Sequence, residues 1–259
     1  MEMEFYKYQG TGNDFIVVDG IQYSAQLSIA QIQKCCDRRF GIGADGLIVL
    51  KSHPEFDFEM EYYNADGHPG SMCGNGGRCI VHFAFSKGYV KEQCRFLAVD
   101  GIHEAILLRN GNISLEMKDV KGIQTVNSDF FLNTGSPHHI RFVKDIENFN
   151  VFTEGKTIRN NERYKKEGTN VNFAEWIGDR LFVRTYERGV EEETLSCGTG
   201  VTAAAIVAGN IGNNEKSNKI NIKTRGGDLA VSYTVNDTGF SDIRLEGPAT
   251  FVYKGIIEL

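Results

Sequence analysis

The chain has 259 residues and a formal net charge of −6, with 41% hydrophobic and 24% charged residues. This composition is typical of a globular protein with one large domain or two small ones, and the acidic balance argues against a nucleic-acid partner. No apolar run approaches the roughly 18 residues of a membrane span, and the N-terminus lacks the basic and apolar stretches of a secretory signal. We therefore expect a cytoplasmic protein without a membrane partner.

Hydrophobic patterning predicts mostly strands in the first half of the chain. Residues 5–19 are typical of a strand, a glycine loop and a second strand. Because a strand follows Gly10-Thr11-Gly12, this Gly-x-Gly is not a dinucleotide fingerprint. Ser28 is expected to cap a helix over residues 29–39. Further strands are predicted over residues 47–50, 56–62, 94–99, 103–108 and 112–117.

The second half repeats the plan of the first at a nearly constant spacing. Cys197 lies 124 residues after Cys73, and Thr134 lies 123 residues after Thr11. A last strand over 249–257 is expected to return to the first half. We predict a duplicated α/β protein whose halves are residues 1–119 with 249–259, and residues 120–248.

Six cysteines are present, at positions 35, 36, 73, 79, 94 and 197, and no two of them form a Cys-x-x-Cys pair. A zinc site is therefore not expected, and free thiols are favoured over disulfides in a reducing compartment. Cys35, Cys36 and Cys79 fall in helix-like stretches, where a thiol packs as a small apolar group.

Cys73 and Cys197 each precede a Gly-polar-Gly loop that opens into an apolar run, which predicts a buried helix. Free N–H groups at a helix start attract anions and favour a thiolate there. Two such thiols in equivalent halves suit inversion at a carbon beside a carboxylate, where one removes a proton and the other returns one to the opposite face. Two alternatives stay open at this point. Both cysteines could be structural, or one could serve a cysteine hydrolase with a histidine, which leaves the other unexplained.

Five segments carry a resemblance to a known family. They are residues 10–15, 63–67, 72–78, 186–189 and 196–200, with the sequences GTGNDF, YNADG, MCGNGGR, YERG and SCGTG. They closely resemble diaminopimelate epimerase, and the resemblance spans nearly the whole chain. It implies interconversion of LL- and meso-diaminopimelate on the lysine and cell-wall route, without cofactor or metal. It also implies two pseudo-symmetric halves, each a curved mixed sheet around a central helix, with the site in the cleft between them, and a homodimer.

The resemblance assigns roles by position. Cys73 is similar to the base that acts on the LL isomer, and Cys197 to its partner for the meso isomer. Residues at the helix starts would hold the α-carboxylate, and polar side chains in both halves would hold the far amino-carboxylate end. Two further residues match positions that tune the thiols. The carboxylate set is Gly74, Asn75, Gly198 and Thr199; the far-end set is Asn13, Asn64, Asn170 and Arg188; the tuning pair is His138 and Glu187, with Glu187 also near substrate.

Two positions depart from the family pattern. Many members have Asn where this chain has Ser136, and some have Gln where it has Gly46. The reaction type is therefore better supported than the substrate, and two other functions stay open. They are a proline or hydroxyproline racemase of the same superfamily, and a non-catalytic amino-acid-binding protein. A Cys73–Cys197 disulfide is weighed as an oxidative hazard that would inactivate the enzyme, and not as its function. A phenazine-type isomerase is disfavoured because those proteins lack the cysteine pair.

Overall fold

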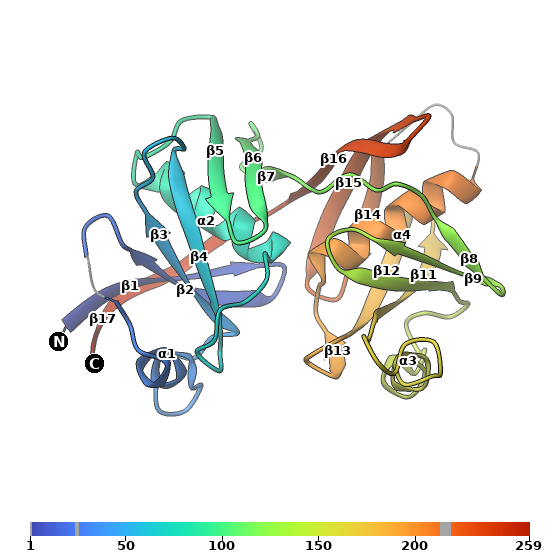
Figure 1. Cartoon of the computed structure of the whole chain (residues 1–259), viewed down its shortest axis with the longest axis horizontal. Coiled ribbons are helices and arrows are strands. Elements are labelled where there is room, and N and C mark those ends of the chain that lie inside the picture. Colours follow the sequence, from blue (N-terminus) through green and yellow to red (C-terminus); the bar gives the residue numbers. More distant parts are fainter. Residues whose placement is uncertain (1, 24–25, 213–218) are drawn as a thin grey trace. The chain divides into compact units, whose positions relative to one another are not determined.

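A computed structural model describes residues 2–23, 26–212 and 219–259. The chain divides into two compact units. Unit 1 consists of Met1–Leu115 and Gly247–Leu259, and unit 2 consists of Glu116–Glu246. Each unit has mostly strands and two helices (Figure 1). None of the helices in the described ranges is both long enough and apolar enough to cross a membrane.

Unit 1 contains most of the first half of the chain and the last strand. Its elements are β1 (Glu2–Gly10), β2 (Asn13–Asp19), α1 (Ile29–Cys36), β3 (Gly46–Lys51), β4 (Phe58–Asn64), α2 (Gly74–Ser86), β5 (Gln93–Ala98), β6 (Gly101–Leu107), β7 (Ile113–Glu116) and β17 (Thr250–Glu258). The predicted strands and the helix after Cys73 are confirmed.

Unit 2 contains the remaining elements. They are β8 (Gln124–Val126), β9 (Asp129–Asn133), β10 (Pro137–Phe142), α3 (Val151–Arg159), β11 (Asn170–Ile177), β12 (Arg180–Glu187), β13 (Glu192–Thr194), α4 (Gly198–Ile211), β14 (Lys219–Thr224), β15 (Gly227–Asn236) and β16 (Gly239–Gly247). The predicted helix after Cys197 is α4.

The two units repeat one pattern of strand pairing. In unit 1, β2 pairs with β3 in parallel and β3 pairs with β4 in antiparallel. In unit 2, β10 and β11 are parallel, and β11 and β12 are antiparallel. The next steps also match, because β4–β5 and β12–β14 are parallel whereas β5–β6 and β14–β15 are antiparallel. The predicted fold class, a mixed α/β protein of two pseudo-symmetric halves, is confirmed.

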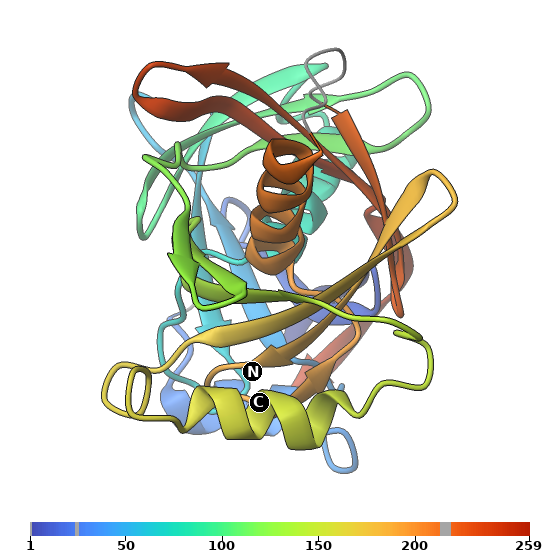
Figure 2. The same ribbon diagram turned by 90° about the vertical axis from the view of Figure 1, so that its right-hand side faces the viewer.

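Each unit folds its sheet around one helix. Helix α2 contacts β1 to β4, β6 and β17, and helix α4 contacts β9 to β12, β14 and β15. Nearly every residue from Val201 to Gly209 is buried, so α4 is apolar on all sides as expected of a helix enclosed by strands. Figure 2 shows α4 within the curved strands of unit 2. Its Gly and Ala residues let the strands approach the helix closely.

Two predicted boundaries can be compared with the structure. β17 pairs antiparallel with β1 along nearly its whole length, so the prediction that the last strand returns to the first half is confirmed. The predicted helix over residues 29–39 is capped by Ser28 but ends at Cys36. The carboxylate of Asp37 accepts hydrogen bonds from the backbone N–H groups of Arg39 and Phe40, and this local turn replaces the last helical turn.

Candidate active site

Cys73 and Cys197 occupy the same backbone position in their units. Each is the N-cap residue of its helix, with φ/ψ of −110°/119° at Cys73 and −117°/112° at Cys197. Neither side chain caps its helix, so the first-turn N–H groups that follow are not satisfied by the thiols. The predicted helix-start position of both cysteines is confirmed.

In unit 1, strand register brings two predicted residues to one edge of the sheet. Asn13 begins β2, and Asn64 ends β4. Gly46, which begins β3, pairs with both Phe15 of β2 and Asn64 of β4. Because β2 and β3 run in parallel and β4 runs against them, Asn13 and Asn64 lie at the same edge.

The side chain of Asn13 joins that edge to the start of α2. The Cys73 thiol donates to Asn13 Oδ1 at 3.5 Å, and Asn75 Nδ2 donates to the same oxygen at 3.3 Å. Asn13 Nδ2 donates to Asp45 Oδ2 at 2.6 Å. The structure therefore brings Asn13, Cys73 and Asn75 together and fixes the orientation of the Asn13 amide.

A group of charged side chains surrounds this amide. Arg38 forms ion pairs with Asp14 at 2.7 Å and with Asp45 at 2.6 Å, and Lys7 pairs with Asp14 at 2.7 Å. Burial by itself would raise the pKa of Asp14, but the hydrogen bonds and charges of Arg38 and Lys7 outweigh it and lower that pKa to about 2. The Asn13 amide, which contacts Cys73, therefore lies beside a group of charged side chains that are joined by ion pairs.

In unit 2, the equivalent edge carries His138, Asn170 and Glu187. His138 of β10 pairs with Asn170, the first residue of β11, and Glu187 is the last residue of β12. Asn170 Oδ1 accepts from the backbone N–H of Arg188 at 2.9 Å, while Thr194 donates to Glu187 Oε2 at 2.9 Å. The predicted far-end and tuning residues of unit 2 therefore share one edge.

His138 is fully buried. Its Nδ1 lies 3.1 Å from Asn172 Nδ2, which assigns the ring proton to Nε2. Nε2 is buried and has no hydrogen-bond partner among the described residues. Burial, with a smaller contribution from the positive charge of Arg188, lowers the pKa of His138 to about 3, so this ring is neutral near pH 7.

The Cys197 thiol lies beside a hydroxyl group instead of an amide. Its Sγ is 3.5 Å from Thr199 Oγ1, and either atom can donate. The Thr199 carbonyl in turn accepts from Thr134 Oγ1 at 2.9 Å. Thr134 precedes Ser136 in the turn that leads into β10, and the two are joined by a backbone hydrogen bond.

The site also explains one departure from the family pattern. A side chain at Gly46 would place Cβ 2.5 Å from Cε2 of Tyr62 and 2.6 Å from the backbone oxygen of Tyr63. The Tyr62 ring therefore occupies the space beside this glycine, and no larger side chain fits there without movement of the backbone of β4.

Comparison with known proteins identifies the family. The family model described as "Diaminopimelate epimerase" matches residues 5–123 and 130–252. A protein of Flavobacterium psychrophilum named diaminopimelate epimerase is 49% identical over 98% of this chain and 100% of its own length. The chain belongs to the diaminopimelate epimerase family. The family assignment and the prediction that the chain is an isomerase are both confirmed.

One more relative supports the family, and two solved structures show the fold. The diaminopimelate epimerase of Chlorobaculum tepidum is 44% identical over 96% of this chain and 99% of its own. A PhzF-family phenazine biosynthesis protein of Bacillus anthracis has a TM-score of 0.78 over 100% of both chains at 14% identity. A hydroxyproline epimerase of Agrobacterium vitis has a TM-score of 0.71 over 99% of this chain and 92% of its own at 12% identity. These two structures share the fold of the diaminopimelate epimerase family.

The other four cysteines are buried in the core. All six cysteines are free thiols. Burial raises the pKa of Cys35, and it raises the pKa values of Cys36, Cys79 and Cys94 to about 12. The interpretation of Cys35, Cys36 and Cys79 as packing residues is confirmed. Among the described residues, no group of three or more His, Cys, Asp and Glu side chains is arranged to hold a metal ion.

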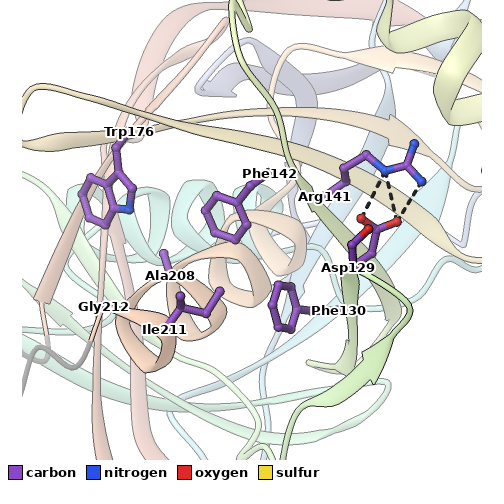
Figure 3. A pocket seen from close by; sticks show the side chains of 9 residues that line it. Asp129, Phe130, Arg141, Phe142, Trp176, Ala208, Ile211 and Gly212 are labelled. Atoms are coloured by element: carbon purple, nitrogen blue, oxygen red, sulfur yellow. Dashed lines mark hydrogen bonds and ion pairs between the residues drawn. The ribbon is translucent and has the colours of Figure 1, made fainter.

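Unit 2 contains a pocket of about 480 Å³ that is separate from these residues (Figure 3). Ala208, Ile211 and Gly212 line it at the end of α4, so it is about 20 Å along the helix from Cys197. Aromatic side chains and an Asp129–Arg141 ion pair of 2.8 Å complete its wall. None of the residues assigned from the diaminopimelate epimerase family lines it.

Three residues near the site carry no assignment from the sequence. Asp45 holds the Asn13 amide, Asn172 orients His138, and Arg78 contacts Asn75 through its guanidinium at 2.9 Å. For Asn172 the sequence offered one signal. It is a polar residue in a largely apolar strand, two residues after Asn170. Arg78 lies within the MCGNGGR motif, but the motif alone gives it no contact.

Proposed function

We propose that this protein epimerises LL-diaminopimelate to meso-diaminopimelate with Cys73 and Cys197 as its two acid–base groups, without a cofactor. The observation that carries the proposal is the equivalent N-cap position of two thiols in duplicated units. The names of relatives at 49% and 44% identity support the substrate. The reaction lies on the route to lysine and to peptidoglycan.

The proposed reaction needs no electron donor or acceptor. A thiolate removes the α-proton, so that a C–H bond breaks, an S–H bond forms and the electron pair stays on the α-carbon. The second thiol then gives its proton to the opposite face and becomes a thiolate. Cys73 acts on the LL isomer and Cys197 on the meso isomer, and one turnover exchanges their protonation states.

The carbanion needs stabilisation because the α-proton is weakly acidic. The N–H groups of Gly74 and Asn75 on α2, and of Gly198 and Thr199 on α4, are the donors we propose for the α-carboxylate. The positive end of each helix dipole adds to this effect where negative charge develops.

The far amino-carboxylate end of the substrate is assigned to both units. Arg188 is exposed and its guanidinium donates to the backbone oxygen of Glu167 at 3.0 Å, so it can exchange this contact for a substrate carboxylate. Asn170 holds the backbone of Arg188, while Asn13 and Asn64 supply amides from unit 1. Their shared edges within each unit support this assignment.

His138 and Glu187 are the proposed tuning residues. A neutral His138 with a proton on Nε2 is a hydrogen-bond donor, which stabilises a nearby anion without adding a full charge. Glu187 accepts from Thr194 and lies beside Arg188, so a negative charge is placed at the same strand end.

We also propose a homodimer in the cytoplasm, with no nucleic-acid partner. Strand β17 carries Phe251, Val252, Tyr253 and Ile256, which are 44%, 51%, 43% and 65% exposed. Apolar side chains on an exposed strand are typical of a surface that a second copy covers. Sedimentation at micromolar concentration tests this proposal. A monomer for the parent chain would contradict it, as would a dimer that persists when Val252 and Ile256 are both changed to Ser.

The second candidate is a racemase or epimerase for proline or hydroxyproline. The fold shared with a hydroxyproline epimerase supports it, although 12% identity supports no more than the fold. A binding protein would hold an amino acid without exchanging its α-proton, and a redox switch would join the two thiols on oxidation.

A substrate panel separates these functions. LL-diaminopimelate, meso-diaminopimelate, proline and trans-4-hydroxyproline are incubated separately with the reduced enzyme, and isomers are resolved by chiral chromatography. We expect interconversion of the two diaminopimelates alone. Turnover of proline alone would support the proline or hydroxyproline racemase. Binding without turnover of any compound would support the amino-acid-binding protein. Cys94→Ala is the matched thiol-removal control, because Cys94 is buried in β5 away from the site.

A further inference from the structure

Arg78 is a buried cation without a carboxylate partner. Its side chain is fully buried in the first turns of α2, and no acidic side chain in the described part of the chain forms an ion pair with it. Its hydrogen-bond partners among the described residues are neutral oxygens. A buried charge of this kind is costly unless an anion balances it. Consistent with this, burial lowers the pKa of Arg78, and the nearby thiols of Cys79 and Cys73 oppose that shift.

The guanidinium holds the start of α2 together. It donates to Asn75 Oδ1 at 2.9 Å, to Thr11 Oγ1 at 3.2 Å and to the Gly74 backbone oxygen at 3.3 Å. A fourth bond runs from Arg78 Nε to the Pro248 oxygen at 3.2 Å. Because Asn75 Oδ1 faces Arg78, Asn75 Nδ2 faces Asn13 Oδ1, which is the atom that accepts from Cys73.

We propose that Arg78 is a positioning residue for Cys73. Through the Asn75 amide it fixes the Asn13 oxygen that accepts from the Cys73 thiol, and once Cys73 has lost that proton the charge of Arg78 balances the thiolate. This inference rests on the proposed function in that it assigns Cys73 a thiolate role. Within unit 1, the ionisable groups around this position are Arg78 and Cys79 on α2, and the ion-paired group that is reached through Asn13. That group consists of Asp45, Arg38, Asp14 and Lys7. Cys79 stays a thiol because burial raises its pKa to about 12, and Asp45 is paired with Arg38. Cys73 is the remaining thiol of this group that can provide the anion.

Unit 2 has a neutral residue at the matching place. Thr202 lies four residues into α4 from Gly198, as Arg78 lies four residues into α2 from Gly74. Thr202 Oγ1 donates to the Gly198 backbone oxygen at 2.9 Å, which corresponds to the bond from Arg78 to the Gly74 oxygen. At this helix position unit 1 has a cation and unit 2 has a hydroxyl group, so Thr202 serves as a control within the same protein.

The experiment measures the pH at which Cys73 becomes half-reactive toward iodoacetamide. A Cys197→Ala background leaves Cys73 to titrate alone, and peptide mass spectrometry separates it from the buried cysteines. Arg78→Gln, Arg78→Lys and Thr202→Val are compared in this background. We expect Arg78→Gln to raise the midpoint by about one pH unit, which is about a tenfold slower reaction below the midpoint. Arg78→Lys and Thr202→Val should leave the midpoint near that of the parent.

An unchanged midpoint in a folded Arg78→Gln variant would overturn the proposal, because a purely structural role predicts lower stability without a shift. Should Arg78→Gln fail to fold, the parent is titrated with ¹⁵N-labelled arginine. The Arg78 guanidinium signals should shift at the Cys73 midpoint and lose that shift in Cys73→Ala, and their failure to shift would also overturn it. Neither readout uses diaminopimelate, so failure of the substrate panel would be a separate result.

Discussion

The N-terminus of α2 in unit 1 and that of α4 in unit 2 have the same backbone but different surroundings. Cys73 lies near Arg78, with Asp45 reached through the Asn13 amide. In the unit of Cys197, Thr202 occupies the helix position that corresponds to Arg78, and the buried His138 is neutral. The difference extends to the strand below each helix, where Ile48 in unit 1 is replaced by Asn172 in unit 2.

This difference separates two tasks. The duplicated backbone places each thiol at a helix start, so it determines where acid–base chemistry is possible. The side chains around each thiol determine how readily it ionises, and these side chains are not duplicated. The residue without a counterpart in unit 1 is Arg78 of helix α2, whereas in unit 2 it is Asn172 of strand β11. Under the two-base proposal, the two thiols can therefore be tuned separately although their backbones are the same.

The largest expected effect follows removal of either thiol. Cys73→Ala and Cys197→Ala should each lower the rate of inversion by about 10² to 10⁴-fold, because this is the usual contribution of acid–base catalysis by a side chain. Both variants should unfold near the urea midpoint of the parent, since each residue lies at a loop–helix junction. Full inversion by either variant would show that the two units do not contribute one base each.

A helix glycine in each unit offers a second matched pair. A Cβ at Gly200 would lie 2.3 Å from Asn172 Oδ1, and that oxygen is held by Thr185 at 2.9 Å. A Cβ at Gly76 would lie 3.2 Å from the flexible end of Ile48. Gly200→Ala should therefore destabilise the protein by about 2 kcal/mol, and Gly76→Ala by less than about 0.5 kcal/mol, because alanine also favours the helix. Urea unfolding of both variants measures the difference, and equal costs would mean that Asn172 gives way as easily as Ile48.

Acid should lower the free energy of unfolding through the ion pairs of Asp14 in unit 1. The folded pKa of Asp14, about 2, lies below its ordinary value of 3.8. A depressed carboxyl pKa stabilises the fold above the unfolded pKa, and this stability is lost as pH falls from about 4 toward 2. The loss is up to about 2 kcal/mol. Urea unfolding at pH 5 and pH 3 should show it in the parent, whereas Asp14→Asn should be less stable at pH 5 and lose less on acidification. A parent and variant with equal pH dependence would contradict this source of acid sensitivity.

A small effect is also expected for Thr202→Val. The variant loses one hydrogen bond to the Gly198 oxygen and keeps the volume of the side chain, so the cost should be about 1 kcal/mol. The urea midpoint measures it. A cost as large as that of Arg78→Gln would mean that the two helix starts depend on this position equally, against the proposed difference between the units.

The sequence predicted what repeats, and it missed what differs between the units. Helix starts, strand alternation and the spacing of the cysteines are local or periodic signals, so the duplicated plan was visible before the structure. The contacts of Arg78, Asp45 and Asn172 join segments distant in the chain, and pattern alone assigns them no partner. The helix that ends at Cys36 was overestimated because Asp37 forms a turn that competes with the last helical turn. The sequence could not explain the glycine at position 46, because the Tyr62 ring that leaves no space for a side chain there comes from another strand.

The most direct test of the two-base proposal is the fate of the α-hydrogen in the first turnovers. LL-diaminopimelate is incubated with the reduced enzyme in D₂O, and α-hydrogen content is followed by proton NMR in the residual LL isomer and in the meso product. Two thiols predict that early meso product carries deuterium from the second thiol, while residual LL substrate still carries its original hydrogen. Early meso product that retains the original hydrogen would mean that one group both removes and returns it, and would contradict the account.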